Sequence, residues 1–243
     1  MLERFSARTS AEAPSGAIVS GTGDMTRPLA AEALGSGLLT FLTVATGLLA
    51  ERFSAGSVGL AMLATALAAA AAFAVLAQTL GGLAGSYFNP GLALGLALFR
   101  KLPLGLALLS AAAQMATAML GVVLAHMVTN TGLVQVATEI QFGPPVWIGE
   151  FIGTALVILV LLRLTETAPH RIPLLGAFAM LAVALATPSL SLANPAVTLA
   201  RGLTDSFTSI RLGDASLIVL CQFAGALAAC LLSGWLFRDG THR

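Results

Sequence analysis

The sequence predicts an all-α membrane protein, with six transmembrane helices and two half-helices arranged as an inverted repeat. Three observations predict this fold: the composition, six long apolar runs, and a set of motifs that occurs twice. Of the 243 residues, 57% are hydrophobic and 9% are charged, whereas a soluble domain carries about 25% charged residues. The apolar surface must therefore be buried in a bilayer. The net charge of +1 gives no basic field for a nucleic-acid partner.

Six apolar runs are long enough to cross a bilayer, which takes about 20 residues. They do not alternate polar and apolar residues as barrel strands would, so each predicts a helix. The runs cover residues 29–50, 58–80, 104–128, 146–164, 172–190 and 213–237. They define a disordered N-terminal tail (1–28), a first three-helix repeat (29–128), an extracellular connecting loop (129–145), a second repeat (146–237) and a C-terminal tail (238–243).

The distribution of Lys and Arg predicts that both termini are cytoplasmic, because cytoplasmic loops carry the excess of these residues. With the N-terminus inside, nine cationic residues fall on the inner side and three on the outer side. The inner ones are Arg4, Arg8, Arg27, Arg100, Lys101, Arg163, Arg171, Arg238 and Arg243, and the outer ones are Arg52, Arg201 and Arg211. We therefore expect a multi-pass protein of the plasma (inner) membrane, with lipid as a partner.

Two segments between the spans, 81–103 and 190–212, predict half-helices that dip into the membrane. Each contains an Asn-Pro motif, Asn89-Pro90-Gly91 in the first and Asn194-Pro195-Ala196 in the second. Asparagine is a good N-cap and proline suits the first helical position. The residues that follow each motif are mostly apolar, which favours a short helix within the membrane over one that lies in water.

The same motifs recur in the same order in the two halves of the chain. The order is Glu, Asn-Pro, Gln: Glu32, Asn89 and Gln114 in the first half, and Glu150, Asn194 and Gln222 in the second. Because three spans per half is an odd number, the second half enters the membrane from the opposite side. The two half-helices can then meet with their N-termini at the midplane.

This arrangement predicts a pore for small uncharged molecules. Each helix N-terminus carries about +0.5 charge, and two of them facing a narrow lumen repel cations. The amides of Asn89 and Asn194 can donate hydrogen bonds to a neutral solute. We interpret Glu32 and Glu150 as acceptors for backbone N–H groups of the dipping loops, with proton coupling as the alternative role.

No pattern in the chain indicates an enzyme, a cofactor or a metal site. The two cysteines, Cys221 and Cys230, both lie in the last apolar run and have no metal-ligand spacing. We therefore expect no catalytic residues.

The six spans, the paired Asn-Pro half-helices, and the paired Glu and Gln residues resemble the aquaporin and aquaglyceroporin (major intrinsic protein) family. The resemblance covers residues 29–237. It implies a homotetramer with one pore per subunit and passive conduction of water and small neutral solutes. The first motif departs from the family's Asn-Pro-Ala, because Gly91 replaces the alanine.

The resemblance also implies four positions for the selectivity filter, carried over by spacing from the two asparagines: Ala69, Ala182, Ser191 and Val197. Val197 stands where family water channels place an arginine. Arg201, four residues later, does not occupy that site. The four residues would form a wide, uncharged ring that admits solutes larger than water, such as glycerol.

The stretch from Ser189 to Phe207 is similar to a bacterial branch of the family that is often encoded with arsenic-resistance genes. This similarity implies neutral arsenic and antimony hydroxides as further solutes. A secondary transporter built on the same inverted repeat is the alternative function. It would show saturable, gradient-coupled flux and would need ionisable residues on its path.

Overall fold

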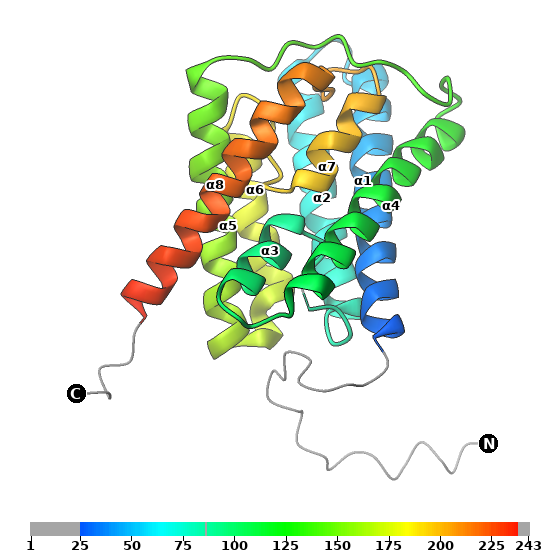
Figure 1. Ribbon diagram of the computed structural model, residues 1–243. Helices are drawn as coiled ribbons and strands as arrows, with labels where there is room; N and C mark the ends of the chain where they lie inside the picture. The colour runs from blue at the N-terminus through cyan, green and yellow to red at the C-terminus, as the bar shows by residue number, and fades with distance from the viewer. Residues whose placement is uncertain (1–24, 86, 238–243) are drawn as a thin grey trace, which may run out of the picture.

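The computed structural model describes residues 25–85 and 87–237, which form six long helices, two short helices and two 3₁₀ turns (Figure 1). The long helices are α1 (Thr26–Phe53), α2 (Val58–Leu80), α4 (Leu104–Val128), α5 (Pro144–Thr167), α6 (Ile172–Ala186) and α8 (Leu212–Leu236). Each is long and apolar enough to cross a membrane, α6 together with the 3₁₀ turn η1 (Pro169–Arg171) that precedes it. The six predicted spans are thereby confirmed as helices.

The ends of three helices, α1, α5 and α6, differ from the sequence prediction by more than one residue. Helix α1 begins at Thr26, so residues 26–28 belong to a helix and not to the tail. Helix α5 begins at Pro144, inside the predicted connecting loop. The helix predicted over 172–190 is shorter in the structure, because α6 ends at Ala186. Thr187 has an extended backbone with φ −117° and ψ 141°, which is the conformation that the following proline imposes. The rest of the predicted tails, 1–24 and 238–243, lies outside the described residues.

Two short helices follow the Asn-Pro motifs, α3 (Pro90–Leu98) and α7 (Pro195–Ala200). In each, the asparagine has an extended backbone and its Oδ1 accepts the N–H two residues later, at 2.9 Å for Asn89 and 3.0 Å for Asn194. The proline that follows lacks an N–H that would go unbonded in the first turn. Local capping chemistry therefore fixes where both half-helices start.

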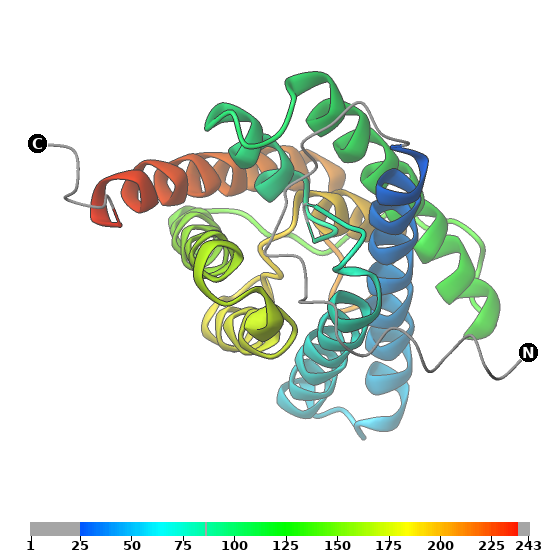
Figure 2. The ribbon, with the colours of Figure 1, turned by 90° about the horizontal axis from the view of Figure 1, so that it is seen from below.

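The order of two long helices, one short helix and one long helix occurs twice along the chain. Helix α3 packs against α4 and α8, and α7 packs against the same two helices. Viewed from below, the segments that lead into α3 and α7 lie near the middle of the bundle (Figure 2). The bundle thus places both Asn-Pro motifs in its interior.

The long helices approach each other closely where glycine faces a neighbouring backbone. A Cβ on Gly121 of α4 would come 2.3 Å from the carbonyl oxygen of Gly37 in α1. A Cβ on Gly225 of α8 would come equally near, 2.3 Å from the carbonyl oxygen of Phe151 in α5. Small residues at such crossings are typical of helices that associate in lipid.

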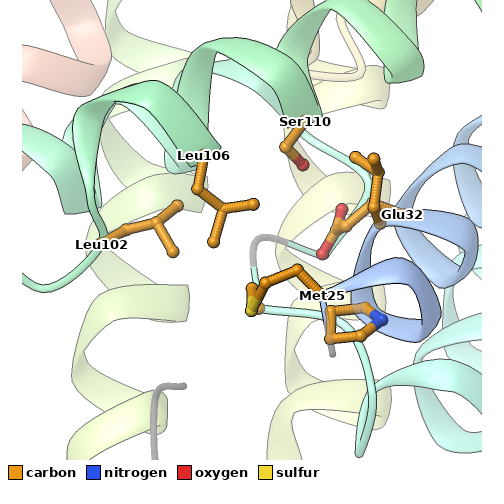
Figure 3. A pocket seen from close by; sticks show the side chains of 8 residues that line it. Met25, Glu32, Leu102, Leu106 and Ser110 are labelled. Atoms are coloured by element: carbon orange, nitrogen blue, oxygen red, sulfur yellow. The ribbon is translucent and has the colours of Figure 1, made fainter. Parts of the chain in front are cut away.

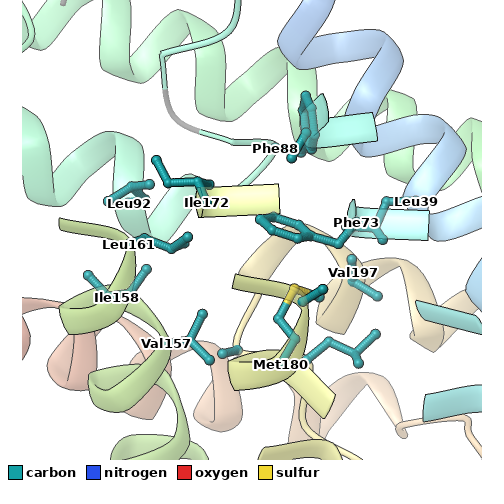
Figure 4. Close-up of a cluster of buried hydrophobic side chains, with 14 of the residues drawn as sticks. Leu39, Phe73, Phe88, Leu92, Val157, Ile158, Leu161, Ile172, Met180 and Val197 are labelled. Carbon is teal, nitrogen blue, oxygen red and sulfur yellow. The ribbon is translucent and has the colours of Figure 1, made fainter. Parts of the chain in front are cut away.

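Apolar side chains fill the interior and also cover the outside. A buried cluster that includes Phe73, Phe88 and Val197 joins α2, the α3 region and α7 (Figure 4). On the outside, large apolar side chains such as Leu220 (64% exposed) and Trp235 (73% exposed) face away from the bundle. An apolar exterior of this extent suits a protein surrounded by lipid acyl chains.

Candidate functional site

The two Asn-Pro motifs bind each other across the middle of the bundle. The Nδ2 of Asn89 donates to the carbonyl oxygen of Ala193 at 2.8 Å, and the Nδ2 of Asn194 donates to that of Phe88 at 2.9 Å. Each asparagine thus bonds the residue that precedes the other asparagine. Both are buried, with 4% and 2% exposed. The side-chain amide of each has a second N–H, which can donate a hydrogen bond to a solute.

The crossed bonds bring two helix N-termini together. A Cβ on Gly91, in the first turn of α3, would lie 3.8 Å from Cδ of Pro195 at the start of α7. The positive ends of the two helix dipoles therefore lie next to each other. A cation that reached this point would lose its water shell and meet positive partial charges, whereas a neutral solute would meet hydrogen-bond donors.

The residues before the asparagines hold a conformation that side chains seldom adopt. Phe88 has φ +62° and Ala193 has φ +51°. A non-glycine residue in the left-handed region costs about 1–2 kcal/mol, so the surrounding contacts must hold these loops in place. Two buried glutamates, one in each half, are central to those contacts.

Glu32 of α1 holds the first loop. Its Oε2 accepts the backbone N–H of Phe88 at 2.7 Å and the Nε2 of Gln114 in α4 at 2.6 Å. The carboxylate also lines a cavity of about 20 Å³ with Met25, Leu106 and Ser110 (Figure 3). That volume is enough for one water molecule.

Glu150 of α5 holds the second loop through different donors. Its Oε1 accepts the Ser189 hydroxyl at 2.6 Å, and its Oε2 accepts the Ser191 hydroxyl at 2.6 Å and the Nε2 of Gln222 at 2.8 Å. We expected backbone N–H donors, but the carboxylate binds serine hydroxyls. The same Nε2 of Gln222 donates to Thr198 at 2.8 Å, which links α8 to α7.

The structure brings together only part of the predicted filter. Ala69 and Val197 are 0% and 1% exposed and belong to the same buried cluster. Ser191 is also buried, but its hydroxyl is bonded to Glu150. Ala182 is exposed on α6, as is Phe178 one turn before it, so its place in the filter stays a prediction.

An aromatic pair in the same buried cluster as Val197 was missed from the sequence. The rings of Phe73 and Phe88 meet edge to face, with centroids 6.5 Å apart and an interplanar angle of 69°. Phe73 follows Ala69 by one helical turn, so the helical period could have indicated that it shares the inward face of α2. Phe88 immediately precedes the first asparagine.

A buried arginine was also missed as part of the site. Arg201 begins the 3₁₀ turn η2 (Arg201–Leu203), directly after α7, and is 2% exposed. Its Nη2 and Nη1 donate to the carbonyl oxygens of Ser189 at 2.8 Å and Leu190 at 3.2 Å, and its Nε donates to that of Thr208. The signal in the sequence was its position four residues after Val197, one turn along the same face.

Over residues 25–85 and 87–237, no group of three or more His, Cys, Asp or Glu side chains is placed to hold a metal ion. The polar groups of the site are instead hydrogen-bond donors and acceptors on loops and half-helices. Such an arrangement can orient and pass a neutral molecule.

Comparison with known proteins agrees with this architecture. The chain is 36% identical over 217 residues to "Aquaglyceroporin AqpS" of Rhizobium meliloti (strain 1021), covering 88% of this chain and 92% of that protein. The X-ray structure of the aquaglyceroporin from Plasmodium falciparum has the same fold, with a TM-score of 0.61 at 18% identity over 86% of this chain and 95% of that one. The sequence profile of the major intrinsic protein family matches residues 20–193, and the chain therefore belongs to that family.

Proposed function

We propose that the protein is a passive transmembrane channel for water and small neutral solutes such as glycerol. The observation that carries this proposal is the crossed pair of bonds between Asn89 and Asn194. It holds two positive helix ends and two amide donors at one buried point. Helix dipoles in this arrangement oppose protons and cations, while the donors compensate a neutral solute for part of its lost hydration.

The proposed solutes include molecules larger than water, up to neutral hydroxides of arsenic and antimony. Ala69 and Val197 contribute short, uncharged side chains to the buried cluster between α2 and α7. The relatives named above are described as aquaglyceroporins. An uncharged constriction of this kind offers little compensation to an ion and does not select strongly among neutral molecules.

We further propose a homotetramer in the plasma membrane, with both termini cytoplasmic. The orientation rests on the excess of Lys and Arg on the inner side. Assembly of several copies is supported by the large apolar side chains on the outer faces of the long helices, which can pack against another subunit as well as against lipid.

The proposal is tested by stopped-flow measurements on proteoliposomes that contain the purified protein. The panel contains water, glycerol, urea and the neutral trivalent hydroxides of arsenic and antimony. We expect each solute to enter down its own gradient, in proportion to its concentration, and without any effect of a protonophore. Flux that saturates like a carrier or collapses with the proton gradient would instead support a secondary transporter.

A further inference from the structure

Arg201 is a buried cation, and no carboxylate among the described residues lies at ion-pair distance from it. In the part of the chain that the structure describes, the ion pairs are Lys101–Glu166 and Arg211–Asp214, and neither involves Arg201. Its three hydrogen bonds all go to backbone carbonyl oxygens. A guanidinium has five N–H groups, so these bonds leave two that meet no acceptor among the described residues.

The guanidinium is built into the loop that carries the second Asn-Pro motif. Two of its acceptors, the carbonyl oxygens of Ser189 and Leu190, lie in the segment between α6 and Asn194. Leu190 has φ +50°, so this segment again needs external support. Ser189 connects the cation to the buried carboxylate, because its carbonyl accepts from Arg201 while its hydroxyl donates to Glu150.

The outer connecting loop covers the 3₁₀ turn that begins with Arg201. The backbone N–H groups of Gln135 and Ala137 donate to the carbonyl oxygens of Leu203 and Gly202, at 3.1 Å and 3.2 Å. The turn that begins with Arg201 is therefore enclosed by loops on both sides. A charge in such a site is poorly screened by water and acts over a longer distance than a charge on the surface.

We propose that Arg201 is a specificity-determining residue of the channel. It supplies the fixed positive charge in the outer half of the path. This charge lies one helical turn further along the chain than the neutral side chain of Val197. This inference rests on the proposed channel function. The displaced charge repels cations before they reach the asparagines. Because it stands away from Val197, it leaves the ring wide enough for glycerol, and its remaining N–H groups can donate to the solute.

The experiment compares three variants of the full-length protein in proteoliposomes and planar bilayers. Arg201→Gln removes the charge, and Arg201→Lys keeps the charge but loses the fork of three bonds. Arg52→Gln is the matched control, because Arg52 is an exposed arginine at the same end of the bundle, bonded to Thr129 and Thr131 of the connecting loop. The readouts are the Na⁺-to-Cl⁻ permeability ratio, glycerol flux per folded protein, and thermal unfolding in detergent.

We expect Arg201→Gln to raise the Na⁺-to-Cl⁻ permeability ratio roughly tenfold, because the charge of Glu150 is then unbalanced. Arg201→Lys should keep the ratio of the unmodified protein, even where a looser loop lowers glycerol flux, and Arg52→Gln should change neither. A folded Arg201→Gln variant with an unchanged ratio would overturn the inference, as would a lysine variant that leaks like the glutamine variant. Failure of both to fold would also overturn it, by making Arg201 a purely structural residue. If the unmodified protein passed no glycerol, the channel function itself would be wrong.

Discussion

Replacing Glu150 by glutamine tests whether its carboxylate has a structural role or takes part in translocation. Its two oxygens accept three hydrogen bonds, one on Oε1 from Ser189 and two on Oε2 from Ser191 and Gln222. A glutamine has only one oxygen, so it can accept at most the two bonds at the Oε2 position. Its Nε2 would replace Oε1 and donate to the Ser189 hydroxyl, which reverses the third bond. All three then become bonds between neutral groups.

The expected cost follows from these contacts. A hydrogen bond to a charged group contributes about 1.5–3 kcal/mol and a neutral one about 0.5–1.5 kcal/mol. Three bonds weakened in this way cost about 4 kcal/mol in total. No water compensates for the weakened bonds, because Ser189 is 1% exposed and Glu150 is fully buried. Glycerol flux through the folded fraction should remain passive.

The assay is thermal unfolding of the detergent-solubilised variant, followed by glycerol flux per folded protein. A loss of this size should lower the midpoint by roughly 10 °C. Glu51→Gln is the control, because Glu51 is exposed at the end of α1, where a substitution changes stability by about 0.5 kcal/mol or less. A Glu150→Gln variant with unchanged stability and abolished flux would refute the structural role and place the carboxylate on the path.

Three further substitutions probe the middle of the bundle. Gly35→Ala should lower stability by about 1–3 kcal/mol in thermal unfolding, because the new Cβ would come 2.0 Å from Cδ1 of Phe88; Phe88→Leu should restore part of the loss. Val197→Arg should lower the ratio of glycerol to water permeability several-fold, since a bulky cation narrows the buried ring. Asn194→Asp should raise cation conductance in planar bilayers, because a carboxylate loses the bond to the Phe88 carbonyl and offsets the positive helix ends.

Each of these three predictions would be contradicted by a particular result. Full stability of Gly35→Ala would mean that the Phe88 ring moves aside without cost. An unchanged permeability ratio in folded Val197→Arg would place residue 197 away from the constriction. Normal solute flux without added cation leak in Asn194→Asp would put the second asparagine outside the path.

The sequence predicts the features of this fold that depend on local chemistry. The spans follow from apolar length, and the starts of α3 and α7 follow from capping by Asn89 and Asn194. Which side of α6 faces the bundle interior could not be predicted. All sides of this helix are apolar, so no periodicity distinguishes the side of Ala182 from the buried side. The environment of Arg201 was equally inaccessible, since its acceptors are backbone carbonyls from two separate loops.

The crossed asparagine bonds have a consequence for how the chain is assembled. Asn89 is synthesised long before its acceptor at Ala193. The carbonyl of Phe88 is likewise synthesised long before its donor, the amide of Asn194. Unpaired backbone groups at membrane depth are costly, so the first half cannot settle its re-entrant loop until the second half has been inserted. The two halves are therefore one cooperative unit, and a fragment that ends after α4 lacks the partner that completes its own motif. Co-expressed halves should regain the native structure only as a pair.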